Sequence, residues 1–263
     1  MAPTVKVVAL HRETVLAFDA YIRQAEAGMQ QAHHGGGSFL WSDASPDRAR
    51  RLEQGEILAQ LWTGSDPVQV PHGLIHDWVG AASIPGASVE RTLELVQDYD
   101  NHRNIYKPDV IDSKLISRCG DDFKVYLRLL KKKIITVVLE TDHDVRYSRL
   151  ERSRWYCVSR TTRIAEVQDA GKPNEVTLPA DTGHGFLWRL YSYWKFQGRD
   201  DGTLIECRAV SLTRDIPAVL RWIIQPMVRS LPKDLLFNTL AATRRALAVP
   251  GKVAGYDARP GRA

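Results

Sequence analysis

Six consecutive strand-like segments, followed by a long amphipathic C-terminal segment, restrict the fold of this chain more than any other feature of its 263 residues. A further strand-like segment (74–84) and a helical pattern that begins at Ser88 precede them. Helices kept apart from an antiparallel sheet are typical of the α+β class. A meander of about seven strands has to curl, and a curled sheet around one helix rarely closes without interior volume.

The longest alternating run contains the main ambiguity in the strand assignment. Apolar residues occupy every second position from Phe123 to Leu129, and the same phase resumes from Ile135 to Leu139. We interpret the lysines between them (131–133) as a bend or bulge inside one long strand, with a hairpin as the alternative. The other predicted strands span residues 109–118, 145–150, 154–167, 186–196 and 204–213.

Helical spacing appears at both ends of the chain. Residues 217–248 form the C-terminal pattern, in which Pro226 and Pro232 should kink or split the helix. Near the N-terminus we predict helices over 13–31 and 46–62, and we expect the first to pack on its own domain. The sequence thus predicts an N-terminal helical extension (1–73), a main domain (74–248) and a disordered tail (249–263).

Composition and charge narrow the classes of partner. The formal charge of +5 is a mild excess without a basic block, so we expect no nucleic-acid partner. No run reaches the ~20 apolar residues of a membrane-spanning helix, although transient membrane contact stays open. The start as written indicates the cytoplasm, whereas a longer or processed N-terminus would indicate a periplasmic or secreted protein. Oligomeric state has no signal, and neither metal-ligand spacing nor a phosphate loop is present, so we expect no metal and no cofactor.

Two stretches resemble a known superfamily. One is Ile84-Pro85-Gly86-Ala87-Ser88 with the following helix and Tyr106-Lys107-Pro108-Asp109-Val110; the other is Tyr193-Trp194-Lys195-Phe196 with the Gly-Arg-Asp-Asp-Gly turn at 198–202 and the terminal helix. They resemble START-like (SRPBCC) proteins of the polyketide cyclase and coenzyme Q-binding group. The resemblance covers about two thirds of the chain and implies a helix-grip fold, with a deep apolar tunnel between the sheet and the C-terminal helix.

One strand face is a candidate wall for that tunnel. From residue 186 to 196, every second residue forms a face with bulky aromatic members, while Cys207, Ala209 and Ser211 offer small side chains on the partner strand. Large residues opposite small ones leave room for a ligand, although they can also interdigitate as a solid core. The predicted ligand-binding residues are Trp188, Trp194, Tyr106, Arg160, Glu206, Arg208, Ile223 and Met227. Glu206 and Arg208 contribute only if they point inward, because a buried charge needs a partner.

The leading hypothesis is a non-enzymatic carrier or sensor that binds an apolar small molecule, such as a lipid, a quinone or a polyketide-like compound. The first alternative is a cyclase- or aromatase-like enzyme in which a His, Tyr or Arg side chain assists proton transfer, with His102 and Tyr106 as the residues to test. The second is a protein-interaction module that holds part of another protein in the groove. No residue is assigned a catalytic role.

Overall fold

The computed structural model describes residues 7–34, 38–62, 64, 67–132, 136–215 and 221–248. The expected C-terminal tail (249–263) lies outside these residues. The first part of the chain contains β1 (Val8–Ala9), α1 (Arg12–His34), η1 (Ser42–Ala44), α2 (Pro46–Glu53), β2 (Leu58–Leu61) and β3 (Val68–Val70). Next come β4 (Gly73–Pro85), α3 (Val89–Gln97), η2 (Tyr99–Asn101) and α4 (His102–Ile105).

The remainder is an antiparallel meander that ends in a helix. Its elements are β5 (Val110–Cys119), β6 (Asp122–Lys132), β7 (Thr136–Glu151), β8 (Arg154–Gln168), β9 (Val176–Thr177), β10 (Thr182–Gly183), β11 (Arg189–Arg199), β12 (Gly202–Arg214) and α5 (Arg221–Ala248). The ten-stranded sheet has the order β2-β4-β12-β11-β8-β7-β6-β5, with β3 on β4 and β9 on β8. This is an α+β helix-grip arrangement, as the sequence predicts.

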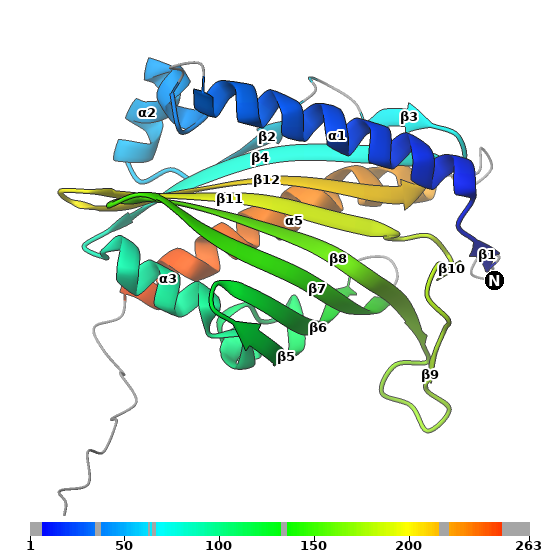
Figure 1. Cartoon of the computed structure of the whole chain (residues 1–263). Helices are drawn as coiled ribbons and strands as arrows, with labels where there is room; N and C mark the ends of the chain where they lie inside the picture. Colours follow the sequence, from blue (N-terminus) through cyan, green and yellow to red (C-terminus); the bar gives the residue numbers. More distant parts are fainter. Residues whose placement is uncertain are drawn as a thin grey trace, which may run out of the picture.

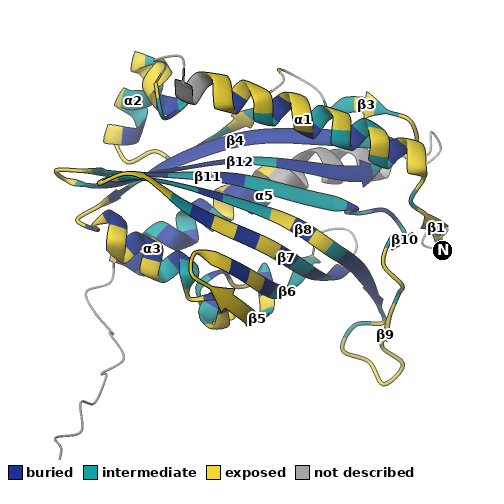
Figure 2. Ribbon diagram, viewed as in Figure 1, coloured by how far each residue is buried: buried dark blue, intermediate teal, exposed yellow. Residues whose placement is uncertain are grey.

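Two helices cover the sheet, one on each of its faces (Figure 1). The helix α5 lies along the inner, concave face, where Leu236 and Leu240 join a core cluster with Phe196 and Ile205. The helix α1 lies along the outer face, where Phe18 and Ile22 pack with other sheet residues. The first helix therefore packs on its own domain, as expected, and β4 and β12 are buried along nearly their whole lengths (Figure 2).

A glycine in β4 allows α5 to approach the sheet closely. A Cβ atom on Gly80 would lie 2.8 Å from the carbonyl oxygen of Leu58 and 2.9 Å from a methyl carbon of Leu240. Both distances are shorter than van der Waals contact, so a larger residue at position 80 would push the helix or β2 away. The absence of a side chain at position 80 therefore determines how closely α5 packs against β4.

Several element boundaries differ from the sequence predictions. The interpretation of residues 123–139 as one bent strand is wrong, because β6 and β7 pair antiparallel and Lys132 lies opposite Thr136. The alternative, a hairpin, is correct. The helix predicted over 46–62 ends at Glu53, and residues 58–61 form an edge strand on β4 instead. The prolines in α5 do not split the helix, which runs from Arg221 to Ala248.

The predicted start of the helix after residue 88 is confirmed. The Ser88 hydroxyl accepts a hydrogen bond from the backbone N–H of Arg91 at 3.2 Å, which satisfies a donor that the first turn leaves free. The helix α3 follows and packs Val89, Leu93 and Val96 into the same core cluster as α5. The sheet, α3 and α5 therefore share one apolar core cluster.

Candidate functional site: a cavity between the sheet and α5

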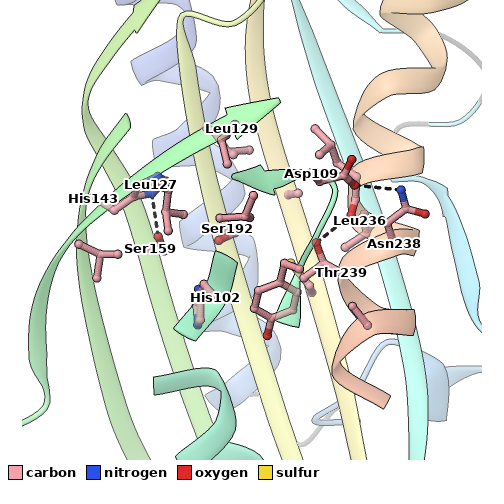
Figure 3. Close-up of a pocket in the computed structure, with 18 of the residues that line it drawn as sticks. His102, Asp109, Leu127, Leu129, His143, Ser159, Ser192, Leu236, Asn238 and Thr239 are labelled. Atoms are coloured by element: carbon pink, nitrogen blue, oxygen red, sulfur yellow. Dashed lines mark hydrogen bonds between the residues drawn. The ribbon is translucent and has the colours of Figure 1, made fainter. Parts of the chain in front are cut away.

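A cavity of about 440 Å³ lies between the inner face of the sheet and α5. Its lining is mainly apolar and comes from β6, β7, β8, β11 and β12, from α5, and from the segment around α4 (Figure 3). Representative apolar members are Val125, Leu127, Leu139, Val145, Leu236 and Ala242. A volume of this size lies within the range of small-molecule sites.

The hairpin of β11 and β12 forms one wall. Trp194 lies opposite Cys207, and Ser192 lies opposite Ala209, so large or polar side chains face small ones across the strands. All four residues line the cavity. The face that the sequence marks as a candidate wall therefore borders the cavity, and its small residues leave space instead of interdigitating with the bulky ones.

A polar group from β7 interrupts the apolar wall. His143 is 6% exposed, and its Nδ1 atom lies 3.3 Å from the Ser159 hydroxyl on the neighbouring strand. Its Nε2 atom lies 2.9 Å from the Thr141 hydroxyl. Burial disfavours the charged imidazolium and lowers the pKa of His143 to about 4, so the ring is neutral near pH 7.

His102 and Tyr106 form a second polar group beside α4. The His102 Nε2–H donates to the carbonyl oxygen of Val96 at 3.1 Å, and the Tyr106 hydroxyl lies 3.2 Å from the Thr243 hydroxyl on α5. Burial lowers the pKa of His102 to about 4 and raises the pKa of Tyr106 to about 12. Both side chains are therefore uncharged near neutral pH.

Two charged side chains of the lining, Asp109 and Lys131, pair with each other beside α5, whereas Lys107 and Arg245 border the cavity as exposed residues. Asp109 accepts a hydrogen bond from Lys131 at 2.7 Å. It also accepts one from the Asn238 amide at 2.9 Å (Figure 3). The Asp109 and Lys131 side chains are 14% and 17% exposed. This pair joins β6 to the segment that follows α4 and keeps its charges away from the apolar interior.

The predicted ligand-binding residues fall into three groups. Trp194 and Tyr106 line the cavity. Trp188 is 4% exposed but packs in the cluster under α1, because it lies in a bend before β11 begins and does not continue the strand's alternation. The side chains of Ile223 and Met227 lie outside the described residues.

The three charged candidates lie on the outer face of the sheet. Arg160 pairs with Glu26 of α1 at 2.5 Å. Arg208 pairs with the fully buried Asp77 at 2.6 Å. Glu206 accepts a hydrogen bond from the backbone N–H of Ser42, and its pKa is raised by burial. The N-terminal extension supplies the partners or the cover for these charges, so they face the extension and not the cavity.

His143 and Ser159 are two residues of the site that were not predicted from the sequence. A signal was present: His143 continues the apolar phase of Val137, Leu139 and Val145. A histidine in an otherwise apolar phase faces the interior and needs a hydrogen-bond partner there. The partner itself lies on another strand and depends on a register that the local sequence does not specify.

The described residues contain neither a cluster that could hold a metal ion nor a helix that could span a membrane. No three His, Cys, Asp or Glu side chains gather there in an arrangement that would hold a metal ion. In the same part of the chain, no helix is both long and apolar enough to cross a membrane.

Three solved structures illustrate the similarity of this chain to known proteins. A STAR-related lipid transfer protein fragment from Xanthomonas axonopodis is 18% identical, covering 70% of this chain and 97% of its own, with a TM-score of 0.44. The Zhui aromatase/cyclase from Streptomyces sp. R1128 is 11% identical, covering 67% and 94%, with a TM-score of 0.45. Human STARD10 is 9% identical, covering 79% and 81%, with a TM-score of 0.42. No family model and no curated protein matches the chain.

Proposed function

We propose that this protein binds an apolar small molecule and encloses it in the cavity between the sheet and α5. The observation that carries the proposal is the cavity of about 440 Å³ with its mainly apolar lining. Moving apolar ligand surface from water into such a site is favourable by roughly 25 cal/mol per Å². Binding therefore needs no cofactor, and a few polar groups suffice to orient the ligand.

The chemistry of the lining supports binding more than catalysis. A cyclase-like enzyme would need a group that takes or gives a proton near neutral pH. His102, with a pKa of about 4, is a weak base, and Tyr106, with a pKa of about 12, is a weak acid. A carrier or sensor of a lipid, quinone or polyketide-like molecule fits these groups better, because it needs them only as neutral hydrogen-bonding partners.

Filling the cavity should weaken binding strongly. Ala209 lines the wall of β12, so Ala209→Phe would place a ring in the ligand's space, whereas Ala27→Phe puts the same side chain on an exposed position of α1. We expect Nile red, a neutral apolar dye, to bind the wild-type protein saturably and at one site. The affinity should fall at least about ten-fold in Ala209→Phe and stay unchanged in Ala27→Phe. Fluorescence titration measures both, and circular dichroism checks that each variant is folded.

Native mass spectrometry of the purified protein provides an independent test. A co-purifying small molecule of apolar character, released by solvent extraction, would support the proposal. If neither a bound molecule nor a saturable dye site is found, enclosure of a ligand is ruled out and the interaction-module alternative gains. Turnover of a hydrophobic substrate that disappears in His102→Ala would favour the enzyme alternative.

A further inference from the structure

The polar atoms on the inner face of the sheet indicate what kind of ligand the cavity accepts. Ser159 and Ser192 lie directly opposite each other on β8 and β11, and Ser192 lies opposite Ala209 on β12. Ser211 is two residues further along β12, so it is a diagonal neighbour of Ser192 on the same face. All three serines line the cavity and form a polar stripe (Ser159, Ser192 and Ser211) in an apolar wall. Figure 3 labels Ser159 and Ser192.

The direction of the hydrogen bond at Ser159 follows from its neighbours. The Thr141 hydroxyl donates to the carbonyl oxygen of Leu127 at 3.1 Å, so its oxygen has to accept from Nε2–H of His143. A neutral imidazole with its proton on Nε2 presents Nδ1 as an acceptor. The Ser159 hydroxyl therefore donates its proton to Nδ1 of His143, and only its oxygen lone pairs remain for other partners.

Ser192 and Ser211, in contrast to Ser159, have hydroxyl protons that are free to donate. The Ser192 oxygen accepts a hydrogen bond from the Trp194 indole N–H at 3.2 Å, which leaves the hydroxyl proton of Ser192 without an acceptor among the described residues. Ser211 is 3% exposed, and its hydroxyl has no hydrogen-bond partner there. The adjacent His76 also has an unpaired ring nitrogen. Buried polar groups are rarely left unpaired, so this part of the wall is short of partners.

Formal charges are missing from this part of the wall. His143 is neutral near pH 7, and Lys131 pairs with Asp109 elsewhere in the lining. The other two cations of the lining are exposed and are not on the sheet: Lys107 follows α4, and Arg245 lies in the last turn of α5. A carboxylate placed at the serine stripe would lose its water without gaining a counter-ion, which is strongly unfavourable. A carbonyl oxygen carries no charge and accepts two hydrogen bonds, which matches two free hydroxyl protons.

We propose that the ligand is an uncharged apolar molecule with a carbonyl oxygen that accepts hydrogen bonds from Ser192 and Ser211. This inference rests on the proposed function, since it assumes that the cavity is occupied. It narrows the substrate class to neutral ketones, quinones, lactones or esters. Hydrocarbons lack the acceptor, and fatty acids or other anions pay for the buried charge.

Three naphthalenes with substituents of nearly equal shape test the proposal. They are 2-acetylnaphthalene, a ketone; 2-isopropylnaphthalene, a hydrocarbon; and 2-naphthoate, an anion at pH 7.5. Equilibrium dialysis gives each dissociation constant for the wild-type protein and for Ser192→Ala/Ser211→Ala. We expect the ratio of ketone to hydrocarbon affinity to fall roughly 5- to 30-fold in the variant, because two hydrogen bonds are lost while the apolar contacts stay.

A matched control uses two serines on the exposed surface. Ser117→Ala/Ser153→Ala removes the same atoms away from the cavity and should leave the ratio unchanged. If the hydrocarbon binds and the ratio is the same in both variants, the carbonyl proposal is wrong while enclosure survives. Tightest binding by the naphthoate overturns the neutral-ligand proposal. If none of the three binds, enclosure fails and the carbonyl proposal fails with it.

Discussion

Asp77→Ala should destabilise the protein by about 3–5 kcal/mol, the typical cost of removing one partner from a buried ion pair. Asp77 is fully buried and accepts hydrogen bonds from Arg208 at 2.6 Å and from the Tyr21 hydroxyl of α1 at 2.6 Å. Without the carboxylate, the Arg208 guanidinium stays buried under Trp62, whose ring lies 4.3 Å away. Urea unfolding at pH 7 measures the loss of stability.

An exposed ion pair provides the control for this experiment. Asp122 pairs with Arg146 at 2.6 Å, but their side chains are 52% and 71% exposed. Asp122→Ala should therefore change the free energy of unfolding by about 1 kcal/mol or less. Equal, small losses in the two variants would mean that the buried Asp77–Arg208 pair contributes no more to stability than an exposed pair does.

Acidification should destabilise the protein between about pH 6.5 and pH 4. His76, His102 and His143 are buried, and desolvation lowers the pKa of each to about 4. In the unfolded chain these rings take up protons near pH 6.5, so the unfolded state binds more protons and gains stability as the pH falls. The three together give a slope of up to roughly 4 kcal/mol per pH unit.

Glu206 has the opposite effect on stability when the pH falls. Burial raises its pKa, so the folded protein takes up this proton before the unfolded chain does, which offsets part of the loss. Urea unfolding at pH 7, 6 and 5 gives the slope directly, and His143→Gln should lower it by about a third. A free energy of unfolding that stays flat from pH 7 to pH 5 would show that these rings do not stay buried and neutral in the folded state.

The sequence predicted the elements where local chemistry determines them. Alternation marked the long strands, and the Ser88 cap marked the start of α3 because its hydroxyl satisfies a backbone donor within the same turn. The sequence did not distinguish a hairpin between β6 and β7 from one bent strand. An odd number of residues in the connection preserves the apolar phase, so a bent strand and a hairpin give the same pattern.

The site was harder to predict because neither face of β12 is exposed to solvent. Leu204, Val210 and Leu212 share the outer phase with Glu206 and Arg208, and both phases are buried. Alternation separates the two faces of a strand but does not tell which one lies inside when each has a helix over it. The pairing of His143 with Ser159 likewise depends on the register of β7 and β8, which is a property of the assembled sheet.

The double cover of β12 divides its residues between two independent tasks. Cys207, Ala209 and Ser211 face the cavity, whereas Glu206 and Arg208 contact the N-terminal extension at Ser42 and at the ring of Trp62. Substitutions of Cys207, Ala209 or Ser211 can therefore alter ligand preference while the contacts of Glu206 and Arg208 stay intact. For protein engineering, this strand is a place where specificity can be redesigned separately from stability.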